Sequence, residues 1–518
     1  MSHEFSYDSI PYISTFQSQI FPGKMATMAT LLGMKPAAIG NCRYLELGCG
    51  EGDNLIGFAY SLPESEFIGV DLSAKHIETA NRSVAELGLK NIRFLQLDVM
   101  KIERGEFGEF DYIAAHGLFS WVPDFVREKV LTIYSEMLAE NGVGYLSYNT
   151  LPGGYLRQMS REMMLFHSQD EPPTLQKVEK GLSILSFLQE STKADPYFNE
   201  IIKNEIGFVT NHDPVSIFHD EFGEINQPFY FHEFAKLAAA HDLQYLSEAE
   251  YIKMPLHDFP PQTAEKLDSF GGDVIRREQY IDFLRCRRFR QTLLCHSKIN
   301  VERDVDPLLL REFFVSSPLL PIDRNADLTK VKPEKFIFPS GVKIEIDHSL
   351  AKVALEKLGS IWTTSVLFDE LIDDSRKKLE EKGVVIADWE KELKTCCSIF
   401  FELFSAGLIE LRTHKPEFSR EISEYPKTGD LVRWQLGKGE SVTTMNITSV
   451  KVDDSFFKNL ILMLDGTKNR LELKKELRKM ISAGKFSDVG EKGDLLRDLP
   501  TMLNQNLRQI ADLGLLVS

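Results

Sequence analysis

The stretch that decides the fold is CRYLELGCGEG at residues 42–52, a short apolar run that ends in three closely spaced glycines. The run predicts a buried strand, and the glycines predict a tight turn that can approach a ligand closely, because no Cβ is in the way. Further strands are expected at 67–73, 92–99, 110–117 and 143–149, with helices between them. This alternation predicts an α/β fold with a Rossmann-like parallel sheet, whose ligands bind at the carboxyl ends of the strands.

Two acidic residues stand where strands of this sheet should end. Asp71 closes the second predicted strand, and Asp98 closes the third. A carboxylate beyond the second strand can accept hydrogen bonds from both hydroxyls of a ribose. Asp98 could meet the amino group of an adenine. The loop and the two acids together therefore predict a site for an adenosine-bearing ligand.

A nicotinamide-dinucleotide site is the alternative. Its fingerprint is G-x-G-x-x-G, but counting from Gly48 and Gly50 the third position is Asp53. A carboxylate at the start of the following helix would also repel a pyrophosphate. The dinucleotide interpretation is therefore disfavoured.

Residues 40–150 resemble the class I S-adenosylmethionine-dependent methyltransferases in the loop and in both acids. The resemblance implies S-adenosyl-L-methionine as cofactor, with the glycines around its methionyl end and ribose. It implies that Glu46 orders the loop or reaches the ligand's amino group. The cofactor-binding residues implied in this way are Glu46, Gly48, Gly50, Gly52, Asp71, Leu72, Asp98 and Val99.

A narrower resemblance covers residues 5–300. It rests on the segments YDSIPY at 7–12, HGLFSWVP at 116–123, SYNTLPG at 147–153, NQPFYFHEF at 226–234 and LQYLSEA at 243–249. These look like the bacterial methyltransferases that carry a methyltransferase regulatory domain. The best understood members methylate lysines on bacterial outer-membrane proteins, so the resemblance implies a protein substrate of that kind.

The loops after the fourth and fifth strands should border the methyl acceptor. They are rich in aromatic side chains, which attract cations: Phe119, Trp121, Tyr148 and Tyr155. A lysine must lose its proton before it can attack, and His116, Tyr12 and Tyr148 could accept or relay that proton. Asn149 and Trp121 complete the candidate catalytic set.

Purely structural roles for the same residues remain as alternatives. His116 could bond only to its own loop, and Trp121 could be a packing residue before Pro123. Tyr7 and Tyr12 could form a lid over the cofactor or simply pack on the surface. The run of arginines at 285–290 reads as a solvated face. His219, His232 and Glu233 lack the spacing of a metal site, so no metal is expected.

The chain beyond residue 150 predicts an insertion and a duplication. Residues 156–230 read as a helical insertion, and 231–252 with 289–297 as the last helix and last two strands of a seven-stranded sheet, so that 1–300 form the methyltransferase core. The alternative is that residues 170–300 form an independent helical domain. Gly359 and Gly466 are 107 residues apart, as are Gly407 and Gly514. We therefore expect two winged-helix-like repeats, at 336–415 and 441–518, with linkers at 301–335 and 416–440.

Composition limits the partners. The net charge is −17 and the isoelectric point is about 5.3, which argues against binding to nucleic acid or to an anionic membrane. No targeting segment and no membrane-spanning run is visible, and the six cysteines have no disulfide or zinc spacing. These features favour a reducing cytoplasm.

The main hypothesis is therefore a protein-lysine methyltransferase, in which the repeats dock the substrate. One alternative is a methyltransferase of a small metabolite or lipid, whose repeats serve assembly, including a possible homodimer. The other is a non-catalytic binding module with a vestigial cofactor fold, which the intact loop and both acids disfavour.

Overall fold

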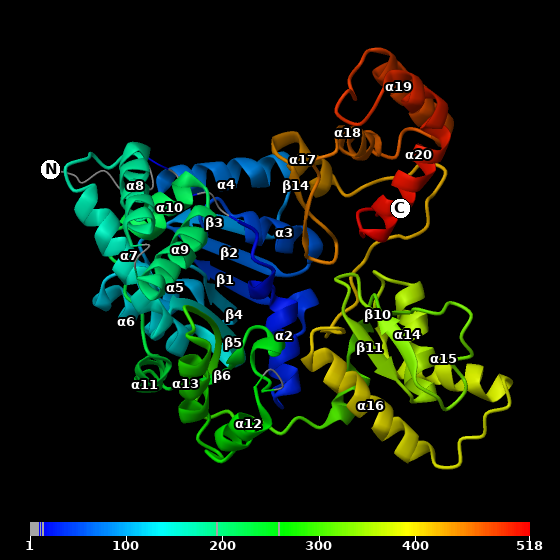
Figure 1. Ribbon diagram of the computed structural model, residues 1–518, viewed down its shortest axis with the longest axis horizontal. Coiled ribbons are helices and arrows are strands. Elements are labelled where there is room, and N and C mark those ends of the chain that lie inside the picture. The colour runs from blue at the N-terminus through cyan, green and yellow to red at the C-terminus, as the bar shows by residue number, and fades with distance from the viewer. Residues whose placement is uncertain (1–9, 11, 13–14, 193–194, 257–258, 518) are drawn as a thin grey trace. The chain divides into compact units, whose positions relative to one another are not determined.

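The computed structural model describes residues 10, 12, 15–192, 195–256 and 259–517 (Figure 1). The chain divides into two compact units, Met1–Glu302 and Arg303–Ser518, here called unit 1 and unit 2. Within the described residues, no helix is both long enough and apolar enough to cross a membrane.

Unit 1 is built around a seven-stranded sheet with the order β3-β2-β1-β4-β5-β7-β6. Neighbouring strands from β3 to β5 are parallel, whereas β7 is antiparallel to both β5 and β6. The Rossmann-like seven-stranded sheet is therefore confirmed. The strands are β1 (Arg43–Leu47), β2 (Glu66–Asp71), β3 (Ile92–Gln96), β4 (Phe110–Ala115), β5 (Leu138–Asn149), β6 (Leu243–Glu248) and β7 (Phe289–His296).

Helices cover the sheet because its strands are apolar on both faces. Helix α4, which follows β2, shows how the sequence fixes both ends of such a helix. At its start, the Ser73 side chain accepts a hydrogen bond from the backbone N–H of His76. At its end, Gly88 adopts a φ of +68° and stops the helix. The longer helices of this layer are α2 (Pro22–Leu31), α3 (Asp53–Ser61), α4 (Ala74–Leu87), α6 (Asp124–Met137), α11 (Phe231–Ala240) and α13 (Val274–Arg285). The short helices are α5 (Arg104–Phe107) and α12 (Pro261–Asp268).

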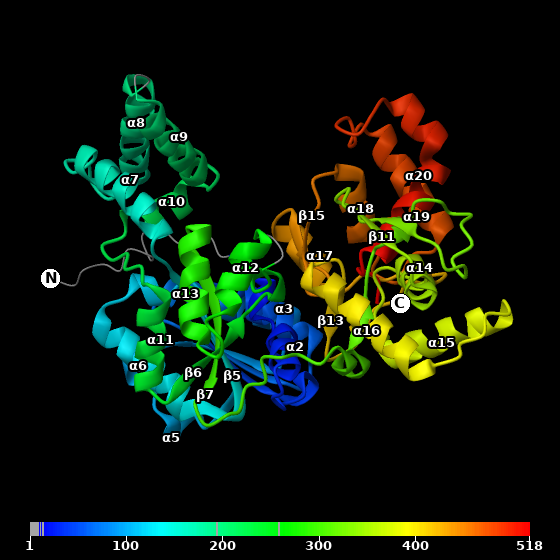
Figure 2. The same ribbon diagram turned by 60° about the horizontal axis from the view of Figure 1, so that its bottom comes forward.

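The helical insertion consists of α7 (Gly153–His167), α8 (Leu175–Ser191), α9 (Pro196–Thr210) and α10 (Pro214–Phe222). The two Asp-Pro pairs that break the pattern start helices, with Asp195 and Asp213 as N-caps and the prolines at the first helical positions. The helices share a small core that includes Met164, Leu185 and Val209. Figure 2 shows them as a bundle that stands away from the sheet, beyond β5 in the chain.

A fully buried ion cluster joins β7 to β6 and α13. Arg290, which has 0% exposure, contacts Glu248 at 2.5 Å, Asp282 at 2.9 Å and Glu278 at 3.0 Å. The Phe231 ring of α11 lies 3.9 Å from the guanidinium carbon of Arg290. Within the run of arginines at 285–290, Arg290 is therefore internal, although we expected a solvated face.

Unit 2 contains two similar copies of one motif. The first copy comprises η6 (Pro307–Glu312), β8 (Phe314–Ser316), β9 (Leu320–Pro321), β10 (Glu334–Ile337), β11 (Lys343–Ile346), α14 (Ser349–Ser360), β12 (Val366–Leu367), α15 (Phe368–Glu381), α16 (Trp389–Ser405) and β13 (Glu410–Arg412). The second comprises α17 (Asp430–Lys438), β14 (Ser441–Thr443), β15 (Ser449–Lys451), α18 (Ser455–Met463), α19 (Arg470–Ser482) and α20 (Lys492–Asp512). From β10 and β14 onward, a two-stranded ladder and three helices follow in the same order in both copies.

The structure corrects both expected linkers. Within 301–335, β8 is the middle strand of the sheet β12-β8-β13, and β9 pairs with β10. Within 416–440, α17 packs into the core of the second copy through Val432 and Leu436. Prolines and charges in these two stretches suggested linkers. The strands were missed because a strand of two or three residues that pairs with distant segments leaves no periodic pattern in the sequence.

Candidate active site

The glycine loop connects β1 to α3 at the carboxyl edge of the sheet. Gly48, Gly50 and Gly52 have φ values of +72°, +54° and +82°, a region that other residues rarely adopt. At Gly52, a Cβ would also lie 2.3 Å from Cζ of Phe94. Packing against Phe94 therefore requires Gly52, whereas no such obstacle stands beside Gly48, where a Cβ would meet only Leu118 at 3.6 Å.

Asp71 holds this loop in place. Its Oδ2 accepts a hydrogen bond from the backbone N–H of Gly50 at 2.9 Å, and its Oδ1 accepts one from Ser73 at 2.9 Å. The side chain is 14% exposed, so part of the carboxylate still faces the site. Asp71 thus braces the loop, which is one of the two roles that the resemblance implied for Glu46.

Glu46, at the end of β1, has a buried carboxylate oxygen without a hydrogen-bond partner among the described residues. Its Oε1 accepts a hydrogen bond from Nδ2 of Asn54 at 3.0 Å, while its Oε2 is buried and lacks a hydrogen-bond partner among the described residues. Burial raises the pKa of the Glu46 carboxyl to about 8. A cationic group beside this oxygen would give it the partner it lacks, which fits the amino group of a methionyl moiety.

The remaining predicted cofactor residues line the neighbouring strand ends. Asp98 is half-buried and accepts a hydrogen bond from the backbone N–H of Met100 at 2.9 Å, which leaves its second oxygen outside that bond. Leu72 is 48% exposed next to Asp71, and Val99 packs at the margin of the core. An apolar side chain that remains exposed at a strand end fits the face of a nucleobase.

His116 follows β4 and lies beside the glycine loop. The register of β1 with β4 ends at the pair Glu46–Ala114, two residues before His116, and the side chain of Leu118 would lie 3.6 Å from a Cβ at Gly48. Its Nδ1 is 2.8 Å from the hydroxyl of Tyr145, and the Phe289 ring contacts it edge-on at 6.0 Å. Burial lowers the pKa of His116 to about 4, so the imidazole is neutral at physiological pH.

Trp121 and Asn149 meet at the next edge of the sheet, after β4 and β5. The backbone N–H of Asn149 donates to the Ser120 hydroxyl at 2.8 Å, and its side-chain Nδ2 donates to Asn226 at 2.9 Å. Arg157 joins them, because its guanidinium carbon lies 5.5 Å from the Trp121 ring and its Nη1 is 3.5 Å from Oδ1 of Asn149.

Two acids of α10 hold Arg157 in this place. Its Nη2 is 2.8 Å from Glu221 and 3.6 Å from Asp220. Burial raises the pKa of both carboxyls. The sequence does not indicate Arg157, because nothing distinguishes a lone arginine on a helix from a surface residue.

Tyr148 and Phe119 do not belong to the site. Tyr148 is 1% exposed, its ring stacks on Phe234 at 4.0 Å, and its hydroxyl is 3.1 Å from Thr292. Phe119 lies in the same apolar cluster with 0% exposure. The predicted proton relay through Tyr148 is therefore wrong. Trp121 is half-buried and Tyr155 is 53% exposed, so these two aromatics remain accessible.

Ile10 and Tyr12 lie against the insertion. The Tyr12 ring contacts the His219 ring edge-on at 5.6 Å, and Nε2 of His219 is 2.6 Å from the carbonyl oxygen of Ile10. The backbone N–H of Gln17 then donates to Oδ1 of Asn54, which in turn bonds Glu46. Tyr12 thus lies against α10 of the insertion. Tyr7 lies outside the described residues.

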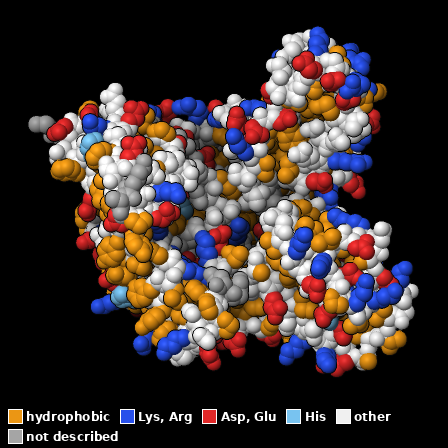
Figure 3. All heavy atoms as spheres, viewed as in Figure 1, with side chains coloured by type: hydrophobic (Ala, Val, Ile, Leu, Met, Phe, Trp, Pro, Cys, Tyr) orange, Lys and Arg blue, Asp and Glu red, His pale blue; other side chains and the backbone are white. Residues whose placement is uncertain are grey.

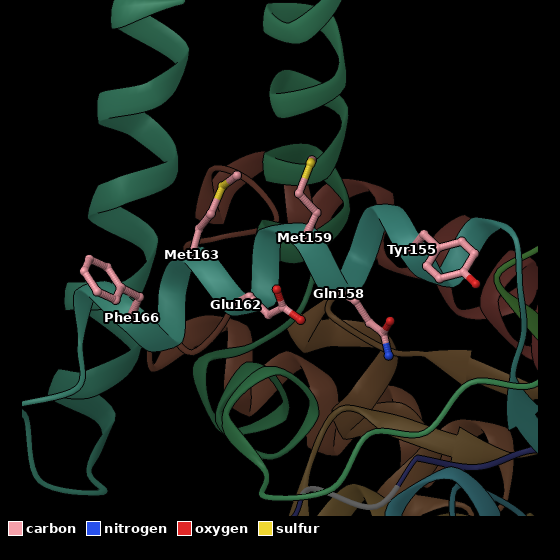
Figure 4. A pocket seen from close by; sticks show the side chains of 6 residues that line it. All are labelled: Tyr155, Gln158, Met159, Glu162, Met163 and Phe166. Atoms are coloured by element: carbon pink, nitrogen blue, oxygen red, sulfur yellow. The ribbon is translucent and has the colours of Figure 1, made fainter.

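A shallow depression of about 590 Å³ is found elsewhere, on the outer face of α7 (Figure 4). All six lining residues come from this one helix: Tyr155, Gln158, Met159, Glu162, Met163 and Phe166. Hydrophobic side chains gather on the surface over this part of unit 1 in Figure 3. The depression touches none of the residues of the glycine loop.

A seven-stranded Rossmann-like sheet with this loop, a braced acid after β2 and a buried acid in β1 defines the class I S-adenosylmethionine-dependent methyltransferases. Family models described as "Methyltransferase domain", "Predicted methyltransferase regulatory domain" and "PKMT, C-terminal winged helix domain" match residues 40–200, 213–296 and 424–515.

Relatives match along the whole chain. The uncharacterized protein RP789 of Rickettsia prowazekii is 30% identical, and the match covers 99% of this chain and 93% of that protein. The structure of PKMT2 from Rickettsia typhi superposes with a TM-score of 0.87 at 28% identity, covering 98% of this chain and all of that one. A second structure of PKMT2, in complex with AdoHcy, gives 0.86. The chain therefore belongs to the family of S-adenosylmethionine-dependent methyltransferases that carry this regulatory domain.

Proposed function

We propose that this methyltransferase modifies lysine side chains of protein substrates, and that those substrates are bacterial outer-membrane proteins. The observation that carries the proposal is the likeness to PKMT2, a protein lysine methyltransferase by its name, over 98% of this chain, unit 2 included. The outer-membrane part rests on the narrower resemblance of the motifs alone.

The chemistry is an in-line displacement. When bound, the cofactor supplies a methyl group on a positively charged sulfur. The nitrogen lone pair of a neutral lysine forms the new N–C bond, the C–S bond breaks, sulfur keeps that electron pair, and nitrogen then releases a proton. Holding the reactants in line can supply about 7–11 kcal/mol of the barrier, so residues that only position them have large effects.

In this proposal the acceptor enters at the edge formed by Trp121 and Asn149. Transfer out of water and the positive charge of Arg157 over the Trp121 ring both lower the pKa of an approaching lysine, which favours the neutral amine. Arg157 fixes the indole ring and the amide together, so that the entrance keeps one geometry. No side chain at this edge needs to be charged to bind the neutral amine.

Unit 2 serves as a docking module for the substrate in this proposal. The two copies differ in charge: α15 begins with Asp369 and Glu370, whereas α19 carries Lys474, Lys475 and Arg478. A cytoplasmic site of action, the absence of nucleic-acid binding and a homodimer remain predictions, which fractionation, an oligonucleotide binding assay and sedimentation would test.

The decisive experiment incubates the enzyme with tritium-labelled S-adenosylmethionine and purified outer-membrane proteins, and maps the label by mass spectrometry. We expect methylated lysines, with little or no label when Asp71→Ala replaces the wild type. Label on another residue type would overturn the lysine assignment. Label only in metabolites or lipids would favour the alternative acceptor class.

A further inference from the structure

Asn54, on α3, connects the buried carboxyl of Glu46 to the main chain at Gln17. Its Nδ2 donates to Oε1 of Glu46 at 3.0 Å, and its Oδ1 accepts from the backbone N–H of Gln17 at 2.7 Å. The side chains of Asn54 and Glu46 are both buried. Gln17 lies outside residues 40–200, which match the methyltransferase model, so that model does not include this connection.

The main chain of Gln17 fixes the orientation of the Asn54 amide. A backbone N–H donates and cannot accept, so the atom of Asn54 beside it must be the amide oxygen. The amide nitrogen is then the atom beside Glu46. The opposite orientation would place two N–H donors against each other and leave Oε1 of Glu46 facing an oxygen.

Aromatic packing holds the main chain of Gln17 in this position. The rings of Phe16 and Phe21, on either side of Gln17 in the sequence, both contact the ring of Phe58 edge-on, with centroid distances of 5.9 and 5.2 Å. Phe58 and Phe21 are buried. Because Phe58 belongs to α3, the segment around Gln17 is fixed to the same helix that carries Asn54.

The two oxygens of Glu46 therefore differ. Oε1 accepts from Asn54, whereas Oε2 is buried and has no hydrogen-bond partner among the residues that the structure describes. Burial raises the pKa of this carboxyl to about 8, so it is mostly protonated at pH 7 without a ligand. The carbonyl oxygen of a carboxylic acid is a stronger acceptor than its hydroxyl oxygen. Oε1 is then the carbonyl oxygen, and the proton is on Oε2.

We propose that Asn54 is a positioning residue for the cofactor: held by the main chain of Gln17, it binds Oε1 of Glu46 and leaves Oε2 as the oxygen that meets the amino group of the methionyl moiety. On binding, the proton of Oε2 passes to the solvent, and the resulting carboxylate accepts from the ammonium group. The N–H of Asn54 stabilises that carboxylate, because a hydrogen bond to a charged acceptor is stronger than one to a neutral acceptor.

The inference rests on the cofactor site and does not depend on the methyl acceptor. The lysine assignment can therefore fail while this inference holds, and the reverse is also possible. The tests below measure the empty enzyme and its binding of ligands, so none of them requires methyl transfer.

The first test is infrared difference spectroscopy of the full chain without ligand, in which a protonated carboxyl has its own C=O band. The band of Glu46 is the one that Glu46→Gln lacks. In Asn54→Leu we expect this band at a higher frequency, because its carbonyl oxygen loses a hydrogen bond. The band should also titrate at higher pH, since the lost N–H favoured the carboxylate. The same frequency and midpoint as in wild type would overturn the proposal.

Gln17 offers a matched pair of variants for the same measurement. Gln17→Ala removes a side chain that donates to Thr15 at 2.8 Å but keeps the backbone N–H, so the spectrum should equal that of the wild type. Gln17→Pro removes the N–H and frees the Asn54 amide to turn its oxygen toward Glu46, which should raise the titration midpoint. Identical midpoints in these two variants would overturn the role of the main chain.

The second test is calorimetry with S-adenosylhomocysteine and with 5′-methylthioadenosine, which lacks the amino-acid part. Asn54→Leu should weaken the first ligand about ten- to hundredfold, the expected loss for a hydrogen bond to a charged group, and leave the second unchanged. In the Glu46→Gln background the same substitution should have little further effect, because Asn54 acts through Glu46. Equal losses for both ligands, or losses that add in the double variant, would mean that Asn54 only supports the fold.

Discussion

Glu46 holds a carboxylate where one of its oxygens has nothing to bond within the described residues. With a pKa of about 8, the group is mostly protonated at pH 7 and must ionise to meet a cationic ligand. We therefore expect S-adenosylhomocysteine binding at pH 7 to release about one proton, and its affinity to rise toward pH 8. Calorimetry in buffers of different ionisation enthalpy measures the proton count. Glu46→Gln, which keeps the bond from Asn54, should release none and bind more weakly.

The same residue should make the free enzyme pH-sensitive. Between the ordinary carboxyl pKa of 4.5 and about 8, the unfolded chain is ionised at this position while the folded one is protonated. The folded state then binds more protons, so its stability falls as pH rises through this window. Glu46→Gln should remove that contribution and melt at a higher temperature than wild type at pH 8 without ligand. An identical melting temperature at pH 8 and at pH 5 in both proteins would contradict this account.

Asp71 is expected to act twice, on the loop and on the ribose. Asp71→Ala removes both bonds that the side chain accepts from Gly50 and Ser73, whereas Asp71→Asn keeps one acceptor oxygen. We expect cofactor affinity to fall by at least about a hundredfold in the alanine variant and less in the asparagine variant. Circular dichroism should show the fold retained in both. Unchanged affinity in Asp71→Ala would remove the assignment.

Local spacing in the sequence predicts some of the site residues and misassigns Tyr148. The loop and both strand-end acids were predictable, because their spacing is local. Tyr148 was misassigned because β5 extends to Asn149, so successive side chains alternate between its faces. Asn149 and Tyr145 share one face, while Tyr148 points into the core under α11. The alternation of side chains along β5 therefore places Tyr148 on the opposite face from Asn149.

Helices α7 and α10 of the insertion contribute Arg157 and its two acidic partners to the edge that we propose for the methyl acceptor. Arg157→Gln should lower kcat about ten- to hundredfold, because Trp121 and Asn149 lose the group that holds them together. The affinity for S-adenosylhomocysteine should not change, since Arg157 contacts none of the loop residues. Arg82→Gln, on the exposed face of α4, is the matched control. A loss of cofactor affinity in Arg157→Gln would mean that the residue acts on the whole fold.

The buried cluster around Arg290 predicts a large effect on stability. Arg290→Met would leave Glu248, Glu278 and Asp282 without their central cation, at an expected cost of about 3–5 kcal/mol in the free energy of unfolding. Arg82→Met, whose guanidinium is exposed and pairs with Glu78, should cost less than about 0.5 kcal/mol. Urea denaturation of the two variants measures the difference, and similar midpoints would show that the cluster is not stabilising.

Long periodic elements were predictable from the sequence, whereas short strands were not. The five strands of the first half and the helices of the insertion follow from hydrophobic spacing and from caps. The three residues of β8 carry no period of their own, and they form a strand only because β12 and β13 flank them. The position of β7 between β5 and β6 likewise depends on pairing between strands that are distant in the sequence, and composition does not predict such pairing.

For the whole molecule, the boundary between units suggests a cut after Glu302 rather than at residue 335. The fragment 1–302 keeps the sheet, the loop and the insertion, so it should bind S-adenosylhomocysteine as the full chain does. We expect it to lose most of its methylation of protein substrates while free lysine or a short peptide is methylated equally by both forms. Full activity of the fragment on proteins would reject the docking role of unit 2.

Residues 213–296 match a family model of their own, yet in the structure they supply α11, β6, α13 and β7 to the methyltransferase sheet. Excising them would leave β5 as an open edge with a row of unpaired amides and carbonyls, which invites aggregation. The segment that matches the regulatory-domain model is thus part of the methyltransferase fold and not a separate domain. Recombination among relatives can keep the enzyme folded only if this stretch and the first five strands are inherited together.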